Sequence, residues 1–129
     1  MSSGSEFLKP ATDSNIDFKV INLEYLVELS MGDTEFQKEL AKQFIDLSIQ
    51  EGKLLDLYFQ ASEYAKIQPV AHSMLSTIYI MGLGPKLETH LNALKDYSSP
   101  KELGLHIEII NAVCKEAREE AAVFIESLA

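Results

Sequence analysis

The sequence has little of three features that would place it in a familiar class: cysteine, long apolar runs and basic residues. Its single cysteine, Cys114, excludes an internal disulfide. No apolar run approaches the roughly 20 residues of a membrane-spanning helix, and no signal-peptide pattern is present. The 11 Lys and Arg residues are outnumbered by 20 Asp and Glu, which gives a formal net charge of -9 at pH 7. Because an acidic chain repels phosphate backbones and anionic lipids, we expect a cytoplasmic protein that binds another protein, with no nucleic acid and no membrane insertion.

Signals for β-structure are missing as well. No stretch shows the alternation of a half-buried strand or the turn residues of a hairpin, and there is no internal repeat. The 47% hydrophobic content argues against disorder, and 129 residues suffice for one domain with one core. The sequence therefore predicts a single all-α domain.

The N-terminus has the composition of a leader rather than of a helix. Gly4 to Phe7 reads as the translation of two adjacent cloning sites, and the residues around it are rich in serine. We therefore expect residues 1–21 to be a cloning-derived start and flexible lead-in, and residues 22–129 to form the domain. Asn22 should cap a short helix over Leu23 to Ser30.

A long helix should follow, opened by Asp33 or Thr34 and ending near Ala61. Gly52 is expected to be its weakest point, because glycine lowers helix stability. Its apolar residues recur at helical spacing: Phe36, Leu40, Phe44, Leu47, Leu54, Leu55 and Tyr58.

The next helix should be capped by Ser62, kinked by Pro69, and ended by Gly82 and Gly84. Its core-facing residues have the 4,3,4,3 spacing of an apolar helix face. These residues are Ile67, Ala71, Met74, Ile78 and Met81.

Two further helices complete the chain. Pro85 permits a short one, which carries Leu87, Leu91 and Leu94 and should stop near Tyr97 and Ser98. Ser99 to Glu102 is a strong start signal for the last helix, with serine as cap and proline at the first position. Its apolar seam is Leu103, Ile107, Ile110, Cys114, Ala117, Ala121, Phe124 and Leu128. The short connections predict an antiparallel up-down four-helix bundle with the short N-terminal helix across one end.

His72 is the candidate functional residue, because it points roughly 140° away from the apolar seam of its helix. We therefore expect it to face solvent. Leu75 and Tyr79 add apolar area to the same outer face, which a merely solvated surface does not need. Ser76, one turn beyond the histidine, is small, and Gln68 lies one turn before it.

These residues resemble the signature of histidine phosphotransfer (HPt) domains, the phosphocarriers of two-component phosphorelay signal transduction. Ala71 and His72 are followed by Gly82 ten residues later, as in that family. Met74 stands for the family's leucine and Ser76 for its small residue, whereas Leu75 replaces a lysine thought to help the incoming phosphate. The resemblance covers Asn22 to Leu128 and agrees with the helix order.

The resemblance implies that His72 accepts a phosphoryl group from a receiver-domain aspartate and passes it to another receiver. The receiver would belong to a response regulator or a hybrid sensor kinase and would supply the magnesium, so we expect no cofactor in this chain. We expect a monomeric phosphoprotein that is a carrier and not an enzyme. Candidate binding residues are Gln68, Leu75, Ser76, Tyr79, Gly82 and Lys86.

Several simpler interpretations remain open. A lone histidine, an exposed Gln68 or a helix-start Lys86 can each be ordinary surface residues. Because Leu75 departs from the family pattern, the chain could also be a module that docks a receiver without transferring phosphate. A third alternative is a purely structural bundle, or a fragment of a larger sensor kinase.

We expect no metal site. His90, His106, Cys114 and His72 could be imagined as zinc ligands, but no two of them have metal-ligand spacing and they fall on three expected helices. Cys114 is expected to be a small core residue. The acidic residues of the last helix should form its solvated face: Glu116, Glu119, Glu120 and Glu126.

Overall fold

The computed structural model describes residues 17–96 and 99–128, and within these ranges it contains helices and no strand. The all-α prediction is confirmed. The expected end of a helix at Tyr97 and Ser98 lies outside the described residues. The elements are α2 (Glu24–Ser30), α3 (Thr34–Gln60), the 3-10 turn η2 (Tyr64–Lys66), α4 (Ile67–Ile80), α5 (Gly84–Ala93) and α6 (Pro100–Ser127).

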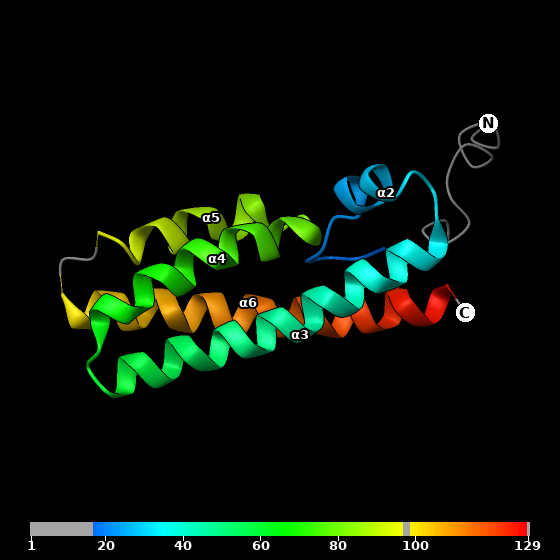
Figure 1. Ribbon diagram of the computed structural model, residues 1–129. Coiled ribbons are helices and arrows are strands. Elements are labelled where there is room, and N and C mark those ends of the chain that lie inside the picture. Colours follow the sequence, from blue (N-terminus) through cyan, green and yellow to red (C-terminus); the bar gives the residue numbers. More distant parts are fainter. Residues whose placement is uncertain (1–16, 97–98, 129) are drawn as a thin grey trace.

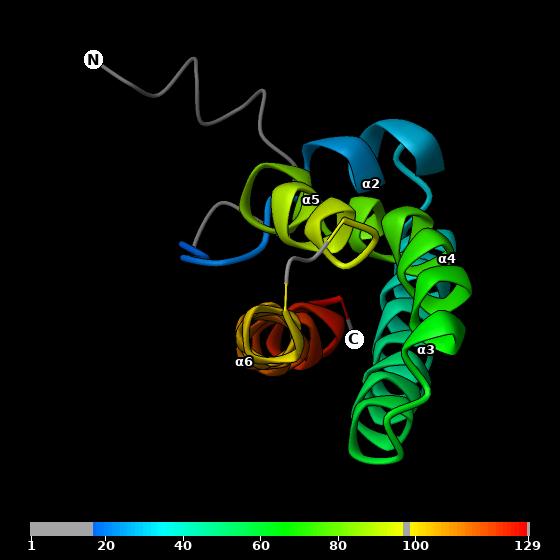
Figure 2. The same ribbon diagram turned by 90° about the vertical axis from the view of Figure 1, so that its left-hand side faces the viewer.

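The four longer helices pack around one core. Helix α3 contacts α4 on one side and α6 on the other, and α5 contacts both α4 and α6 (Figure 1). The end-on view in Figure 2 shows α5 over α6, with α4 and α3 beside them. The short helix α2 lies against α3 and α4. Within the described part of the chain, no helix is long and apolar enough to cross a membrane.

Helix α6 follows its sequence pattern closely. The Ser99 side chain accepts a hydrogen bond from the Glu102 N–H at 3.2 Å, and Pro100 occupies the first helical position. All the expected seam residues from Leu103 to Phe124 are buried, and Leu128 is half-buried. The predicted register of this helix is therefore confirmed.

Helix α3 begins at the expected cap, and its Gly52 lies close to Asn111 of α6. The Asp33 carboxylate caps it by accepting the N–H groups of Glu35 and Phe36 at 3.0 and 3.2 Å. A Cβ atom on Gly52 would lie 2.6 Å from the side-chain oxygen of Asn111 on α6. A side chain at position 52 would therefore require the Asn111 side chain to move, a constraint that a propensity scale does not reveal.

The start of α4 contradicts two expectations. Ser62 does not cap this helix, because it has φ 58° in the turn after α3, and η2 precedes the first residue of α4, Ile67. Pro69 does not kink it, because it lies in the first turn, where a backbone N–H has no partner within the helix. Gly84 opens α5 instead of ending α4.

The segment before α2 packs against α6. The Glu120 carboxylate accepts the backbone N–H groups of Lys19, Val20 and Ile21 at 3.0, 2.9 and 2.9 Å. The ring of Phe18 lies edge-on to that of Phe124, with centroids 6.4 Å apart. Hence the expected lead-in does not extend to residue 21. Glu120 is also not part of a purely solvated face, because its carboxylate binds the backbone N–H groups of residues 19–21. Helical periodicity in the sequence does not predict where that segment lies.

The register of α6 predicts the effect of adding one charge. Ile110 has no exposed area, whereas its neighbour Ile109 is 40% exposed. Ile110→Asp should lower the free energy of unfolding by about 3 kcal/mol or more, because it buries an unpaired carboxylate. Ile109→Asp should cost less than about 1 kcal/mol. Urea unfolding of both variants measures the difference, and equal losses would contradict the described register.

Candidate functional site

His72 lies exposed on α4, as its position on the helical wheel predicts. The flanking seam residues Ala71 and Met74 have no exposed area, so the backbone that carries the histidine is held by the core. The imidazole forms no hydrogen bond or ion pair with another described residue. A neutral imidazole with a free nitrogen lone pair is a nucleophile near neutral pH. His72 is therefore accessible to another molecule and is carried by a firmly packed helix.

Tyr79 connects the histidine-bearing helix to α5, and Gln68 connects it to the turn that follows α5. The Gln68 amide donates a hydrogen bond to the backbone oxygen of Lys95 at 3.3 Å. The Tyr79 hydroxyl donates to the Glu88 carboxylate at 2.8 Å, and this hydrogen bond raises the pKa of Tyr79. Both side chains are exposed at the same time. They hold α5 and the turn after it against α4 and still contribute to the outer face.

Leu75 and Ser76 differ in how much surface they present. Leu75 is half-buried and packs against the core, so the position where the HPt signature has lysine carries no charge. Ser76 is exposed, one turn beyond His72. On that side of His72, these two residues therefore add a small side chain and some apolar area to the surface.

Gly82 and Lys86 flank the connection between α4 and α5. Gly82 has φ 70°, and a Cβ atom on it would lie 2.7 Å from that of Asn22, whose N–H donates to the Met81 oxygen at 3.0 Å. This contact alone explains a glycine here. Lys86 is exposed in the first turn of α5. Roles in binding a partner stay predictions for both residues.

Glu51 on α3 was missed by the sequence analysis. Only 7% of it is exposed, and its carboxylate accepts a hydrogen bond from the hydroxyl of Ser73, the residue after His72, at 2.7 Å. Its second oxygen, Oε1, is buried without a partner among the described residues. The available signal was its spacing, because Glu51 lies between Phe44 and Leu55 on the core-facing stripe. A polar residue at such a position marks a buried polar contact.

Cys114 and Arg118 on α6 extend this polar cluster. Arg118 donates a hydrogen bond to the Ser48 hydroxyl at 3.1 Å. Burial raises the pKa of the Cys114 thiol to about 11, an effect that the Arg118 charge opposes and the Glu51 charge reinforces. The thiol is therefore protonated at neutral pH. It is a buried core residue, as expected.

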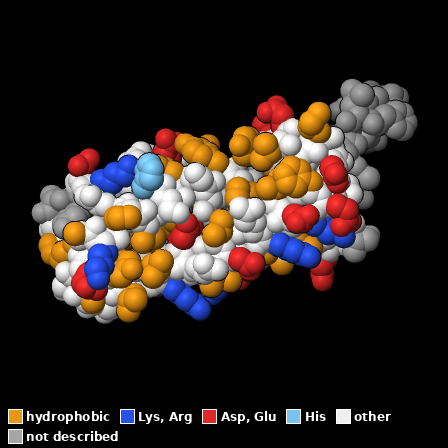
Figure 3. All heavy atoms as spheres, viewed as in Figure 1, with side chains coloured by type: hydrophobic (Ala, Val, Ile, Leu, Met, Phe, Trp, Pro, Cys, Tyr) orange, Lys and Arg blue, Asp and Glu red, His pale blue; other side chains and the backbone are white. Residues whose placement is uncertain are grey.

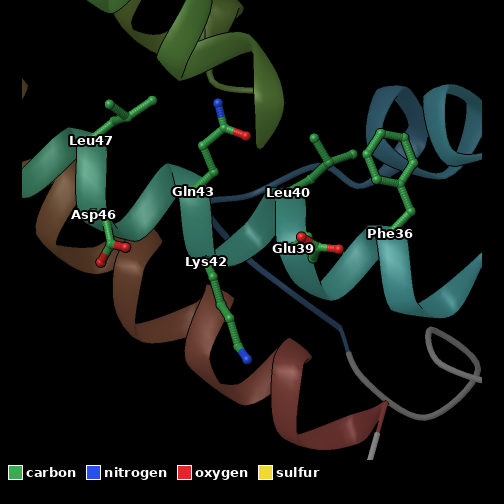
Figure 4. A pocket seen from close by; sticks show the side chains of 7 residues that line it. All are labelled: Phe36, Glu39, Leu40, Lys42, Gln43, Asp46 and Leu47. Atoms are coloured by element: carbon green, nitrogen blue, oxygen red, sulfur yellow. The ribbon is translucent and has the colours of Figure 1, made fainter.

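The surface over α3 and α4 has shallow grooves. Hydrophobic and charged side chains alternate over α3 and α4 in Figure 3. A groove of about 410 Å³ runs along α3, where Leu40, Gln43 and Leu47 point to one side and Lys42 to the other (Figure 4). Phe36 at its end is 41% exposed, so this member of the expected α3 stripe is only partly covered. His72 does not line this groove.

The sequence predicts that the histidines and Cys114 do not converge on a metal site. No three or more His, Cys, Asp or Glu side chains gather into a possible metal site in residues 17–96 and 99–128. His90 and His106, however, face each other across α5 and α6.

Comparison with known proteins gives no match to this chain: no family model, no curated protein and no solved structure resembles it closely enough. What the chain does is therefore inferred from its residues and their geometry.

The contact between Gly82 and Asn22 can be tested against a matched glycine. Gly32 also has a positive φ, 83°, but a Cβ atom there meets nothing within 4 Å. Gly32→Ala should cost about 1 kcal/mol of stability for the left-handed backbone alone. Gly82→Ala should cost about 2–4 kcal/mol, because the methyl group also overlaps Asn22. The comparison requires urea unfolding of both variants; a Gly82→Ala loss no larger than that of Gly32→Ala would show that the close contact is absent.

Proposed function

We propose that this chain is an HPt domain, a phosphorelay intermediate that carries a phosphoryl group on His72 between receiver domains. The observation that carries the proposal is the exposed imidazole, which has no partner among the described residues, on a helix whose opposite face is buried. Phosphoryl transfer depends mainly on positioning and charge neutralisation. A rigidly held nucleophile on an accessible surface meets the first of these requirements.

The chemistry balances without a catalytic group from this chain. The ring nitrogen of His72 that carries no hydrogen attacks the phosphorus of a phospho-aspartate, and the other ring nitrogen keeps its proton. The bond between phosphorus and the aspartate oxygen breaks, and the aspartate leaves as a carboxylate. Transfer onward is the reverse reaction at a second receiver. A receiver would have to supply the magnesium and the positive charge for the phosphoryl oxygens, which is why we describe the chain as a carrier and not an enzyme.

We also propose how the helices are arranged in the bundle. An antiparallel up-down arrangement of α3, α4, α5 and α6, with α2 across one end, agrees with the pairwise contacts of the helices. Such a bundle would present His72 from the side of one helix, where a receiver could approach a broad face. A monomer in the cytoplasm fits this role.

A receiver-docking module without transfer is the second candidate, and the side chain of Leu75 favours it. This residue is half-buried and uncharged at the position where the HPt signature has lysine. A loss of positive charge beside the histidine would slow the approach of a phosphoryl group while leaving an apolar docking face intact.

Phosphate transfer to His72 can be measured directly. After incubation with phosphorylated receiver domains, the wild-type chain should carry acid-labile, base-stable phosphate. His72→Gln should lose this signal, since it removes the nucleophile, whereas His90→Gln and His106→Gln should keep it. Equal labelling of His72→Gln would refute the proposal. Binding of several receivers without any labelling would favour the docking module.

Ser76→Arg separates transfer from folding. For in-line transfer the phosphorus must come within roughly 3–3.5 Å of the imidazole nitrogen, and a long side chain one turn away would stand in that path. Since Ser76 is exposed, the change in stability should be less than about 0.5 kcal/mol. The transfer rate from a receiver should fall strongly while the melting temperature stays unchanged. A wild-type rate in a folded Ser76→Arg protein would mean that no partner approaches over this residue.

A further inference from the structure

A hollow with three basic side chains in its lining lies between α3 and α6. Its volume is about 260 Å³, and its lining consists of Ser48, Ile49, Gly52, Lys53, Asp56, Asn111, Lys115 and Arg118. Asp56 is the one acidic residue among the described residues that form this lining. In a chain whose 20 acidic residues outnumber its 11 basic ones, such a concentration of positive charge is unexpected. We call this site the basic hollow.

Arg118 is held in place at the basic hollow without being neutralised. Its Nη1 donates a hydrogen bond to the Ser48 hydroxyl at 3.1 Å. Ser48 is 1% exposed, and its hydroxyl donates in turn to the backbone oxygen of Ile45 at 3.2 Å, which fixes its orientation. No carboxylate of residues 17–96 and 99–128 forms an ion pair with Arg118. Because a guanidinium has five N–H donors, most of them remain for an anion in the hollow.

The neighbouring charged residues do not neutralise the hollow either. The Asp56 carboxylate accepts a hydrogen bond from the Asn111 amide at 3.1 Å. Glu51 does not line the hollow, and its carboxylate accepts a hydrogen bond from α4 on the other side of α3. Lys53 on α3 and Lys115 on α6 are exposed, and neither forms an ion pair with a described residue. The three basic residues and Asp56 therefore leave the lining with an excess of two positive charges.

This excess matches the charge of one phosphate group. A phosphate monoester carries about −1.5 to −2 charges at pH 7 and has three strong acceptor oxygens. The planar fork of an arginine fits two such oxygens, and a lysine acts as a point charge beside them. We propose that the basic hollow binds a small phosphate monoester. Arg118 donates hydrogen bonds to the phosphate oxygens, while Lys53 and Lys115 neutralise the remaining charge from the two sides.

The adjoining surface gives the ligand a direction. A second hollow of about 320 Å³ continues the groove between α3 and α6, because it shares Asp56 and Asn111 with the basic hollow. The half-buried ring of Phe59 lines it and offers apolar area for the organic part of a monoester. Glu108 lines it too, so the phosphate is repelled from that end and directed to the basic hollow. His72 lines neither hollow, and the proposal does not depend on phosphotransfer.

Titration with phenyl phosphate tests the site. The chain is titrated at pH 7 and 0.15 M ionic strength in a phosphate-free buffer, and its amide ¹H–¹⁵N resonances are followed. The wild type should saturate, with the largest shifts around Gly52, Lys53, Lys115 and Arg118. Lys53→Gln and Lys115→Gln should each weaken binding by about two- to fivefold, as expected for single exposed charge pairs. Arg118→Gln should weaken it by about tenfold or more, because it removes the hydrogen-bond donors.

Lys42→Gln is the matched control for the lost charge. Lys42 is an exposed lysine on the same helix, lines a different groove and lies about 16 Å along the helix axis from Lys53. At this ionic strength charges further apart than about 8 Å are largely screened, so this variant should bind as the wild type does. Melting temperatures without ligand identify any variant that folds poorly. The two lysine variants change exposed residues and keep the test valid if Arg118→Gln is destabilised.

A second ligand tests the charge argument. Phenyl sulfate has nearly the same shape as phenyl phosphate and one negative charge, so it should bind several-fold more weakly and raise the melting temperature less at equal concentration. The proposal is overturned by an absence of saturable shifts up to tens of millimolar phenyl phosphate or by equal binding of phenyl sulfate. Unchanged affinity in both lysine variants, or an equal loss in Lys42→Gln, would also overturn it.

Discussion

The rotation of α4 about its own axis is the constraint on which the rest of the candidate site depends. Burial of Ile67, Ala71, Met74 and Ile78, none of which has exposed area, leaves His72 only the opposite direction. Each large apolar side chain buried in this seam is worth about 1.5–3 kcal/mol, far more than any single surface contact. A helix turned by even one residue position would bury the imidazole and expose a seam residue.

The hydrogen bond between Glu51 and Ser73 acts on the same helix by a different force. Apolar burial is non-directional and tolerates small rotations, whereas a 2.7 Å hydrogen bond from the Ser73 hydroxyl to a buried carboxylate does not. Leaving that carboxylate without the hydroxyl would be costly, because a buried charge needs partners. The polar contact therefore adds precision to an orientation that the hydrophobic seam already favours, directly beside the proposed phospho-acceptor.

The two histidine sites illustrate opposite uses of one side chain. His72 lies on a face with no partner among the described residues, which suits a nucleophile that must meet another molecule. His90 and His106 are half-buried and satisfy each other at 2.9 Å, which suits a site that holds two helices together. The first arrangement leaves an imidazole open to another molecule, and the second joins two helices by a hydrogen bond between imidazoles.

The local sequence pattern determined the helices, the buried seam of α6, the Asp33 and Ser99 caps and the outward direction of His72. Each of these features depends on the spacing of 3.6 residues per turn or on residues about three positions apart. Tertiary structure decided what joins distant segments. The contact of Gly52 with Asn111, the binding of residues 19–21 by Glu120 and the meeting of His90 with His106 each connect different parts of the chain. Periodicity shows which face of a helix is buried; only the packed arrangement shows which residue of another helix lies opposite.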